Sequence, residues 1–160
     1  MMPKTVALVV AGVAYDEEAG APFVLLRNES GNLLSVPVGA FEASAIIIQV
    51  EGINPPRPLT HDILAQFFLR HGFRLLKFEL YAKDTDGYLG KLHYRKGLAN
   101  RSMEVRPSDG IALALRLGAA IEMNADLAED AVPSDAMHYA ALLQSQSVLY
   151  LDNKEKTLQL

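Results

Sequence analysis

Two short stretches of the sequence place an arginine, a hydroxyl and a carboxylate at the start of a predicted helix. The first is 57–62, Arg-Pro-Leu-Thr-His-Asp, and the second is 106–109, Arg-Pro-Ser-Asp. Hydrolysis of a phosphodiester needs carboxylates that hold a divalent metal ion, a base that activates water, and cations that neutralise the phosphate. Together with Glu42, at the start of another predicted helix, the two stretches supply all three kinds of group.

An architectural role for the same residues is the alternative, and it is the more frequent use of such residues. The hydroxyl and carboxylate side chains lie where helix caps and complements to the helix dipole are found: Thr60, Asp62, Ser108 and Asp109. In that interpretation Arg57 and Arg106 simply pair with the carboxylates, and His61 is an ordinary hydrogen-bonded histidine. Both interpretations require the two helix starts to lie close together.

The stretch at 106–109 opens the most apolar helix of the chain, which we predict within residues 106–118. Proline suits the first turn of a helix because its missing amide proton is not needed there. Arg116 suits the negative pole at the end of the helix, and Gly118 suits the left-handed position that follows. Because the intervening residues are almost all apolar, this helix should be buried on most sides. The stretch at 57–62 opens a second apolar helix, which ends at Gly72.

Short apolar runs separated by turn residues predict the strands. The first three runs have tight connections, which favours an antiparallel meander. Asp86-Gly87 is typical of a hairpin turn between two later runs. The predicted strands are 6–14, 23–27, 33–38, 73–81, 88–95, a strand ending at Val105, and 120–123. With the helices, they predict an α+β fold, with an antiparallel or mixed sheet and packed helices in a single domain.

The segment between Gly39 and Gly52 is ambiguous, since its isoleucines favour a strand and its alanines and Glu42 favour a helix. We predict a helix, with Phe41, Ala45 and Ile48 along one stripe. Residues 1–130 are expected to form the domain and residues 131–160 a C-terminal helical extension, with a helix at 134–144.

Composition limits the class of protein. The 160 residues are 50% hydrophobic and 21% charged, as in folded globular proteins, and include no cysteine, which excludes disulfides and thiolate metal sites. The formal net charge of −4 argues against a protein that coats nucleic acid non-specifically.

Basic residues are nevertheless concentrated between residues 91 and 106, where Lys91, Arg95, Lys96, Arg101 and Arg106 accompany His93 and Tyr94. This basic strip faces either a polyanion or only solvent. The apolar run at 6–14 imitates a short signal peptide, but its valines favour a strand. No run has the roughly 18 to 20 apolar residues of a membrane span, and we expect a cytoplasmic protein.

The motifs together resemble those of a known family. The blocks 39–43, 57–64 and 106–116 are similar, in order and spacing, to those of the bifunctional nuclease domain family, over about residues 5–130. The resemblance implies a wedge-shaped α+β domain, often dimeric, with a groove proposed as an active site, and DNase and RNase activity credited to plant members. Glu104, Gly110 and Ala120 depart from the residues usual in the family, where aspartate, alanine and proline are common.

Carried over by position, the resemblance implies a site of eight residues: Glu42, Arg57, Thr60, His61, Asp62, Arg106, Ser108 and Asp109. We expect a nuclease for DNA and RNA in which the carboxylates of Glu42, Asp62 and Asp109 hold Mg²⁺ or Mn²⁺ and act with His61 in catalysis. The expected substrate-binding residues are Arg57, Thr60, Arg106 and Ser108. The alternative is a non-catalytic, dimeric binding or regulatory module in which these residues are caps and interface pairs. In either case we expect a homodimer or higher homo-oligomer.

Overall fold

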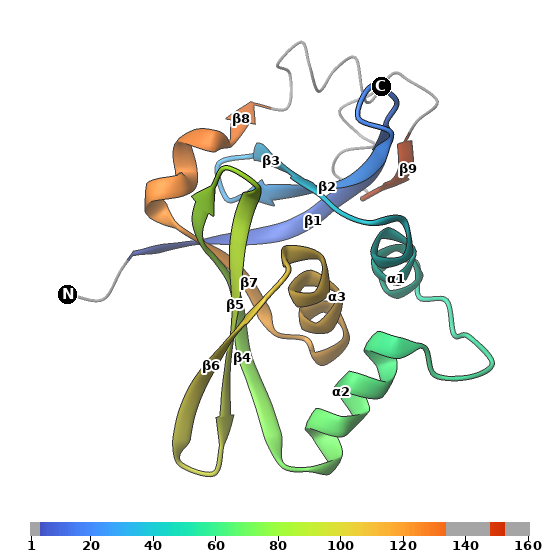
Figure 1. Ribbon diagram of the computed structural model, residues 1–160, viewed down its shortest axis with the longest axis vertical. Coiled ribbons are helices and arrows are strands. Elements are labelled where there is room, and N and C mark those ends of the chain that lie inside the picture. Colours follow the sequence, from blue (N-terminus) through green and yellow to red (C-terminus); the bar gives the residue numbers. More distant parts are fainter. Residues whose placement is uncertain (1–3, 134–147, 153–160) are drawn as a thin grey trace.

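The described strands form one mixed sheet, against which the helices pack (Figure 1). The computed structural model describes residues 4–133 and 148–152. The elements are β1 (Thr5–Asp16), β2 (Ala21–Asn28), β3 (Asn32–Pro37), α1 (Ala40–Val50), α2 (Thr60–Arg70), β4 (Phe73–Asp84), β5 (Gly87–Lys96), β6 (Ala99–Val105), α3 (Pro107–Leu117), β7 (Ala120–Asn124), the 3₁₀ helix η1 (Ala125–Asp130), β8 (Val132–Pro133) and β9 (Val148–Leu151).

The sheet order is β6-β5-β4-β7-β1-β2-β3-β8, and β9 also pairs with β1. Strands β4 and β7 are parallel, and the other pairs are antiparallel. The predicted α+β class is confirmed.

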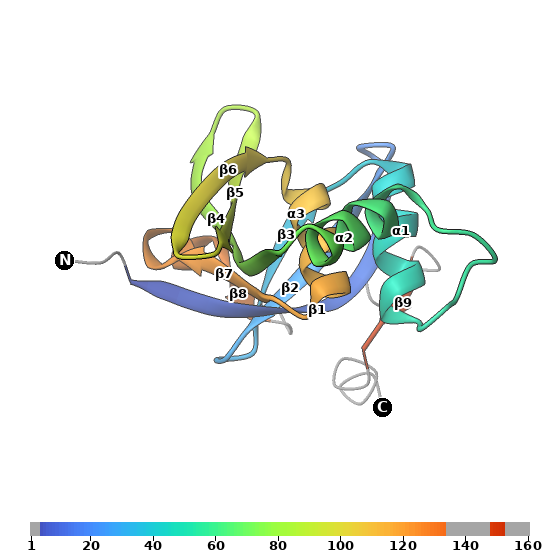
Figure 2. The ribbon, with the colours of Figure 1, turned by 90° about the horizontal axis from the view of Figure 1, so that it is seen from below.

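Helix α3 is the centre of the fold, as its apolar sequence predicts. It contacts α1, α2, β4, β5 and β7, and the side chains from Ile111 to Ala114 have no exposed surface. Figures 1 and 2 show α1, α2 and α3 side by side on the same face of the curved sheet. The helix ends at Gly118, which takes the predicted left-handed conformation with φ of 62°. Because α3 contacts both α1 and α2, it fixes the three helices relative to one another.

Helix α1 forms where the sequence was ambiguous, but its buried stripe differs from the prediction. Phe41 was predicted to be on the apolar stripe and is 89% exposed. The buried side chains are Ala43, Ala45 and Ile46. Small alanines face α3 because the two helices are in contact, and the large ring of Phe41 is left outside. Of the three residues predicted on that stripe, only Ala45 is buried, and Ile48 is partly buried.

The predicted basic strip is divided between the two faces of the sheet. Tyr94 packs against Phe68 of α2, with ring centroids 6.0 Å apart, so Tyr94 and its cross-strand partner Arg101 lie on the helix side. On β5, side chains alternate between faces. Lys91 and His93 are therefore on the other face, where they contact Tyr81 and Glu79.

The segment predicted as a C-terminal helical extension contributes strands where it is described. Val132–Pro133 pairs with β3, and Val148–Leu151 pairs with β1. The helix predicted at 134–144 lies outside the described residues, so the extension stays a prediction. In the described part of the chain, no helix is long and apolar enough to cross a membrane.

Candidate active site

The amino-terminal ends of α1, α2 and α3 meet, and four predicted site residues are connected there. His61 Nε2 lies 2.9 Å from Asp109 Oδ1. Arg106 donates from Nε to Asp109 Oδ2 at 2.8 Å and from Nη2 to Glu42 Oε1 at 2.9 Å. Each helix contributes at least one of these side chains, in or beside its first turn. The prediction that the two Arg-Pro helix starts lie close together is confirmed.

The protonation state of Asp109 determines which nitrogen of His61 is available. Partial burial alone would raise the pKa of Asp109, but hydrogen bonds from Arg106 and His61 outweigh it and lower the pKa below its ordinary value of 3.8. At neutral pH the carboxylate is therefore ionised and can only accept. The shared proton must therefore belong to His61 Nε2, and in the tautomer with this proton alone the lone pair of the ring is on Nδ1.

The second ring nitrogen of His61, Nδ1, makes no hydrogen bond with residues 4–133 and 148–152. The side chain is 13% exposed, and Nδ1 is not among the fully buried unpartnered atoms of these residues. An imidazole that a carboxylate orients through one nitrogen, with the other nitrogen unbonded, is the usual arrangement of a general base.

Arg106 is the exposed cation of this cluster. Its side chain is 65% exposed, and the two carboxylates use one N–H on Nε and one on Nη2. Among the described residues the other three N–H groups of the guanidinium have no acceptor and could meet an incoming anion. The partial positive charges of three helix amino termini add to this attraction. The carboxylates of Glu42 and Asp109 hold the guanidinium in place and raise the pKa of Arg106.

Asp62 has a structural role, although its motif resembles that of Asp109. Asp62 Oδ2 accepts from the backbone N–H of Leu59 at 2.8 Å, and Oδ1 accepts from Arg116 Nε at 2.6 Å. The hydrogen bond from the backbone N–H of Leu59 lowers the pKa of Asp62 most. Partial burial raises this pKa, but the guanidinium of Arg116 lowers it further, so the net shift is downward. Both oxygens are used inside the fold, which is the architectural role considered for this residue.

Arg116 is a positioning residue that the sequence analysis assigned only to the helix dipole. Its side chain is 3% exposed, and its guanidinium also donates to the carbonyls of Ala112 and Ala45. One side chain thereby joins all three helices. An arginine within an otherwise apolar, buried helix was the sequence signal for such a role.

The other predicted site residues are less closely connected. Thr60 and Ser108 are not the caps, because the N-cap positions are occupied by Leu59 and Arg106 and neither makes a side-chain cap hydrogen bond. The predicted caps were wrong by one or two residues. Ser108 is buried, whereas Thr60 is exposed. Arg57 is exposed and makes no ion pair with any described residue.

The three carboxylates do not fit the predicted Mg²⁺ or Mn²⁺ site. Within residues 4–133 and 148–152, no group of three or more His, Cys, Asp and Glu side chains is placed to hold a metal ion. Glu42 and Asp109 bind Arg106, and Asp62 binds Arg116, so arginines stand where a cation would. The divalent metal ion therefore stays a prediction from the sequence.

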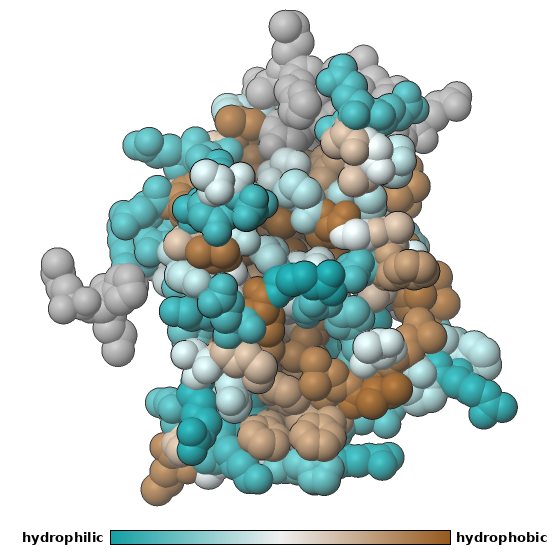
Figure 3. Space-filling model, viewed as in Figure 1, coloured by the Kyte–Doolittle hydropathy of each residue, from teal (hydrophilic) through white to brown (hydrophobic). Residues whose placement is uncertain are grey.

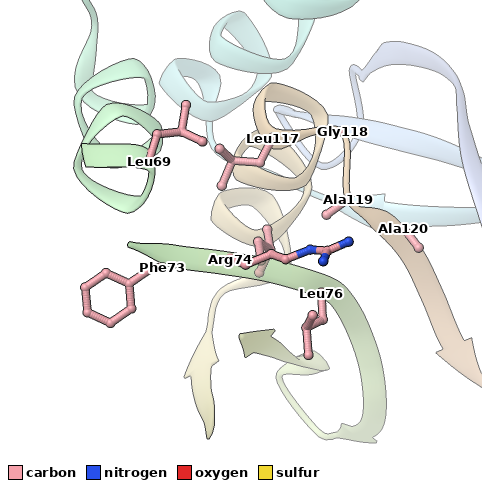
Figure 4. A pocket seen from close by; sticks show the side chains of 9 residues that line it. Leu69, Phe73, Arg74, Leu76, Leu117, Gly118, Ala119 and Ala120 are labelled. Carbon is pink, nitrogen blue, oxygen red and sulfur yellow. The ribbon is translucent and has the colours of Figure 1, made fainter. Parts of the chain in front are cut away.

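Two hollows flank α2. One, of about 350 Å³, is lined by Arg57, Asp62 and Arg116 together with the proline-rich loop. The other, of about 250 Å³, is lined by none of the predicted site residues. In it, Leu69 of α2 and Leu117 of α3 lie near one another, and the guanidinium of Arg74 extends toward Ala120 (Figure 4).

Comparison with known proteins agrees with the motifs. The model of the bifunctional nuclease domain matches residues 24–135. The chain belongs to the bifunctional nuclease domain family. An uncharacterized protein of Mycobacterium tuberculosis is 32% identical over 113 residues, which is 70% of this chain and 67% of that protein. Bifunctional nuclease 1 of Oryza sativa subsp. japonica is 25% identical over 111 residues, which is 66% of this chain and 33% of the rice protein. The chain thus spans about a third of the rice nuclease.

The family match includes all three helices and both Arg-Pro motifs. The cluster of Glu42, His61, Arg106 and Asp109 therefore lies within the domain that gives the family its name. Arg116, which fixes the helices, lies there too.

Proposed function

We propose that the protein hydrolyses phosphodiester bonds of DNA and RNA, with His61 as the general base. The observation that supports this most is the contact of His61 with the ionised carboxylate of Asp109, across two helices, beside the exposed Arg106. The names of the rice relatives point to the same class of reaction. A sequence-independent enzyme is expected, because this cluster presents charges and no base-reading surface of its own.

In the proposed reaction, Nδ1 of His61 takes a proton from the attacking water. The water oxygen forms a bond to phosphorus while the bond to the leaving oxygen breaks, and the leaving oxygen receives a proton from solvent or from His61. Asp109 stabilises the imidazolium that forms, as the third member of a catalytic triad does. Arg106 neutralises the charge that develops on the non-bridging oxygens. Glu42 holds Arg106 in position.

Arg57 is the second expected phosphate ligand, because it lies on the loop before α2 and no described carboxylate pairs with it. Thr60 and Ser108 stay predicted substrate-binding residues. The proposed roles need no metal ion at Asp62. The dependence on Mg²⁺ or Mn²⁺ that the sequence predicts is tested by assays with each ion and with EDTA.

The experiment is a cleavage assay with fluorescently labelled DNA and RNA oligonucleotides. Replacing His61→Ala removes the base and should lower the initial rate by about 10²- to 10⁴-fold. His93→Gln is the matched control, since His93 lies on the opposite face of the sheet, and its rate should equal that of the wild type. Cleavage by His61→Ala at the wild-type rate would reject this role.

The second candidate function is a non-catalytic, dimeric binding or regulatory module. It is favoured by one observation, namely that Asp62 and Asp109 are already paired with arginines inside the fold. If this candidate is correct, purified wild-type protein leaves the oligonucleotides intact. Neither EDTA nor the His61→Ala replacement then changes the result. The homo-oligomer and the cytoplasmic location stay predictions under both candidates.

A further inference from the structure

A cluster of aromatic rings lies at the junction of α2 with β4 and β5, on the helix side of the sheet. Phe68 packs against Phe73 and Tyr94, with ring centroids 5.7 Å and 6.0 Å apart. Phe67 stacks on Phe73 at 6.5 Å and contacts His71 at 4.3 Å. Phe68 is buried and belongs to the core, but Phe67 is 52% exposed. One face of this cluster therefore packs in the core, and the other face is exposed at Phe67.

The exposed part of the cluster continues along α2 toward the candidate active site. Thr60, Leu64, Phe67 and His71 are spaced three or four residues apart and lie on one stripe of the helix. Leu64 is 40% exposed. The axial distance from His61 to Phe67 is about 9 Å at the rise of an α-helix. Hydrophobic residues gather over α2 in the lower half of the face seen in Figure 3.

Cations accompany the rings. Lys96 Nζ lies 4.7 Å from the centroid of the Phe73 ring. Arg101 is the cross-strand partner of Tyr94, so it shares the helix side of the β5–β6 hairpin, and it has no ion pair or hydrogen bond with any described residue. We call this set the α2–hairpin surface; it consists of Leu64, Phe67, Phe73, Tyr94, Lys96 and Arg101.

The composition of the α2–hairpin surface favours a polyanion over a second copy of the chain. In a two-fold symmetric dimer the same patch meets itself, so the two cations of one copy, Lys96 and Arg101, would face a surface that carries the same positive charges. The set contains no carboxylate to compensate them. Phe67 is the exposed ring of the set, and Phe73 and Tyr94 are partly buried behind it. An exposed ring beside cations that have no described carboxylate partner is a feature of surfaces that bind single-stranded nucleic acid, since bases stack on the ring and phosphates contact the cations.

We infer that the α2–hairpin surface binds single-stranded DNA or RNA and directs it to His61. A base stacks on Phe67, and Arg101 and Lys96 contact the backbone. A duplex is a poor ligand, because its bases are already stacked on one another and present no free face. This inference rests on the proposed function and specifies its substrate as unpaired strands.

The test measures binding separately from cleavage. Fluorescence anisotropy with a labelled twelve-nucleotide oligothymidylate, and with a duplex of equal length, is recorded in the His61→Ala background. Phe67→Ala should weaken binding of the single strand about 5- to 150-fold, the range for loss of one base–ring stack. Phe67→Leu should weaken it similarly and Phe67→Tyr should preserve it, because only a ring can stack. Tyr15→Ala, an exposed ring on the β1–β2 hairpin, is the matched control and should bind normally.

Arg101→Ala gives a second readout. It should reduce the slope of log affinity against log salt concentration by about 0.7, the value for one phosphate contact with a single strand. Arg95→Ala, on the opposite face of β5, is the control and should keep the slope. Melting temperatures of all variants are compared with that of the parent, so that a loss of folding is recognised.

Three results would overturn the inference. The first is a folded Phe67→Ala variant that binds the single strand within twofold of its parent. The second is a duplex that binds as tightly as the strand. The third is a change from dimer to monomer in sedimentation of Phe67→Ala and Phe67→Leu with strand binding unchanged, which assigns the surface to a protein interface. Wild-type cleavage combined with the first result rejects this inference alone, whereas Phe67-dependent binding without cleavage rejects the proposed reaction alone.

Discussion

Asp62 and Asp109 occupy equivalent places in two similar motifs but have different partners. Asp109 contacts His61 and the exposed Arg106, whereas Asp62 bonds a backbone amide and the buried Arg116. The difference follows from what lies beside each carboxylate: Asp109, in the first turn of α3, meets His61 of α2, whereas Asp62, in the first turn of α2, meets Arg116 in the last turn of α3. The proposed chemistry therefore uses Asp109, whereas Asp62 holds the helices together.

Replacing Asp62→Asn separates the two roles. A hydrogen bond to a charged group contributes about 1.5–3 kcal/mol, so the free energy of unfolding should fall by that amount when Arg116 loses its anionic partner. Cleavage should stay within a few-fold of wild type. Urea denaturation and the oligonucleotide assay check both, with Asp126→Asn, an exposed carboxylate in the first turn of η1, as the control. A stable, inactive Asp62→Asn variant would return Asp62 to the catalytic set.

The carboxylate of Asp62 should make the free energy of unfolding fall as the pH is lowered into the acid range. The pKa of Asp62 is lowered in the folded protein, relative to an ordinary value of 3.8, chiefly by the Leu59 amide. Its stabilisation is therefore complete above that value and is lost as the pH falls through the folded pKa. Between pH 5 and the acid limit of folding, the unfolding free energy of wild type should fall more steeply than that of Asp62→Asn. Parallel curves would contradict this account.

The sequence predicted the types of residue at the site better than their contacts. The convergence of the Arg-Pro motifs could be predicted because both needed partners of opposite charge. The caps at Thr60 and Ser108 were wrong, because the exact first residue of a helix depends on backbone angles that sequence does not specify. Arg116 was undervalued, since two of its three acceptors, Asp62 and the carbonyl of Ala45, lie 54 and 71 residues away in the sequence.

At the scale of elements, the presence of glycine at position 110 of α3 is explained by its contact with Phe78 of β4. A Cβ atom at Gly110 would lie 2.2 Å to 2.8 Å from atoms of the Phe78 ring, which has no exposed surface and also packs against Gly90. From the sequence alone, glycine only has a lower helix propensity than the alanine usual at this position in the family. In the structure it makes room for Phe78, so the departure from the alanine usual in the family is a matter of packing.

Gly110→Ala should therefore destabilise the protein. Overpacking costs about 1–3 kcal/mol, whereas the gain in helix propensity is about 1 kcal/mol. Adding Phe78→Leu should recover part of the loss, because the smaller side chain frees the space. Thermal denaturation of both single variants and the double variant measures the coupling. A Gly110→Ala variant more stable than wild type would show that β4 can move away from α3.

Most elements were predictable because each has a local pattern, as in the apolar stretch of α3 or the Asp86-Gly87 turn. The parallel pairing of β4 with β7 was not, because the sheet order depends on contacts between distant segments. The buried stripe of α1 was misplaced at Phe41 for the same reason. Which face of a helix is buried depends on the neighbour, here α3, and the pattern of α1 alone is apolar on several faces.

At the scale of the whole molecule, a chain with net charge −4 combines a local cationic surface with the cluster proposed to be catalytic. Arg106 belongs to the cluster, and Lys96 and Arg101 to the α2–hairpin surface. The rest of the acidic protein repels nucleic acid, so binding should be confined to this side of α2. Both features lie within the region that matches the bifunctional nuclease domain.

The most direct measurement of the central claim is the rate of oligonucleotide cleavage by Asp109→Asn, beside its stability. The asparagine keeps the shape of the side chain but removes the charge that orients His61 and stabilises the imidazolium. We predict a folded variant, within about 1 kcal/mol of wild type because its ion pair is partly exposed, whose initial rate falls at least about 100-fold. A folded Asp109→Asn protein that cleaves at the wild-type rate would contradict the assignment of His61 and Asp109 as the catalytic pair.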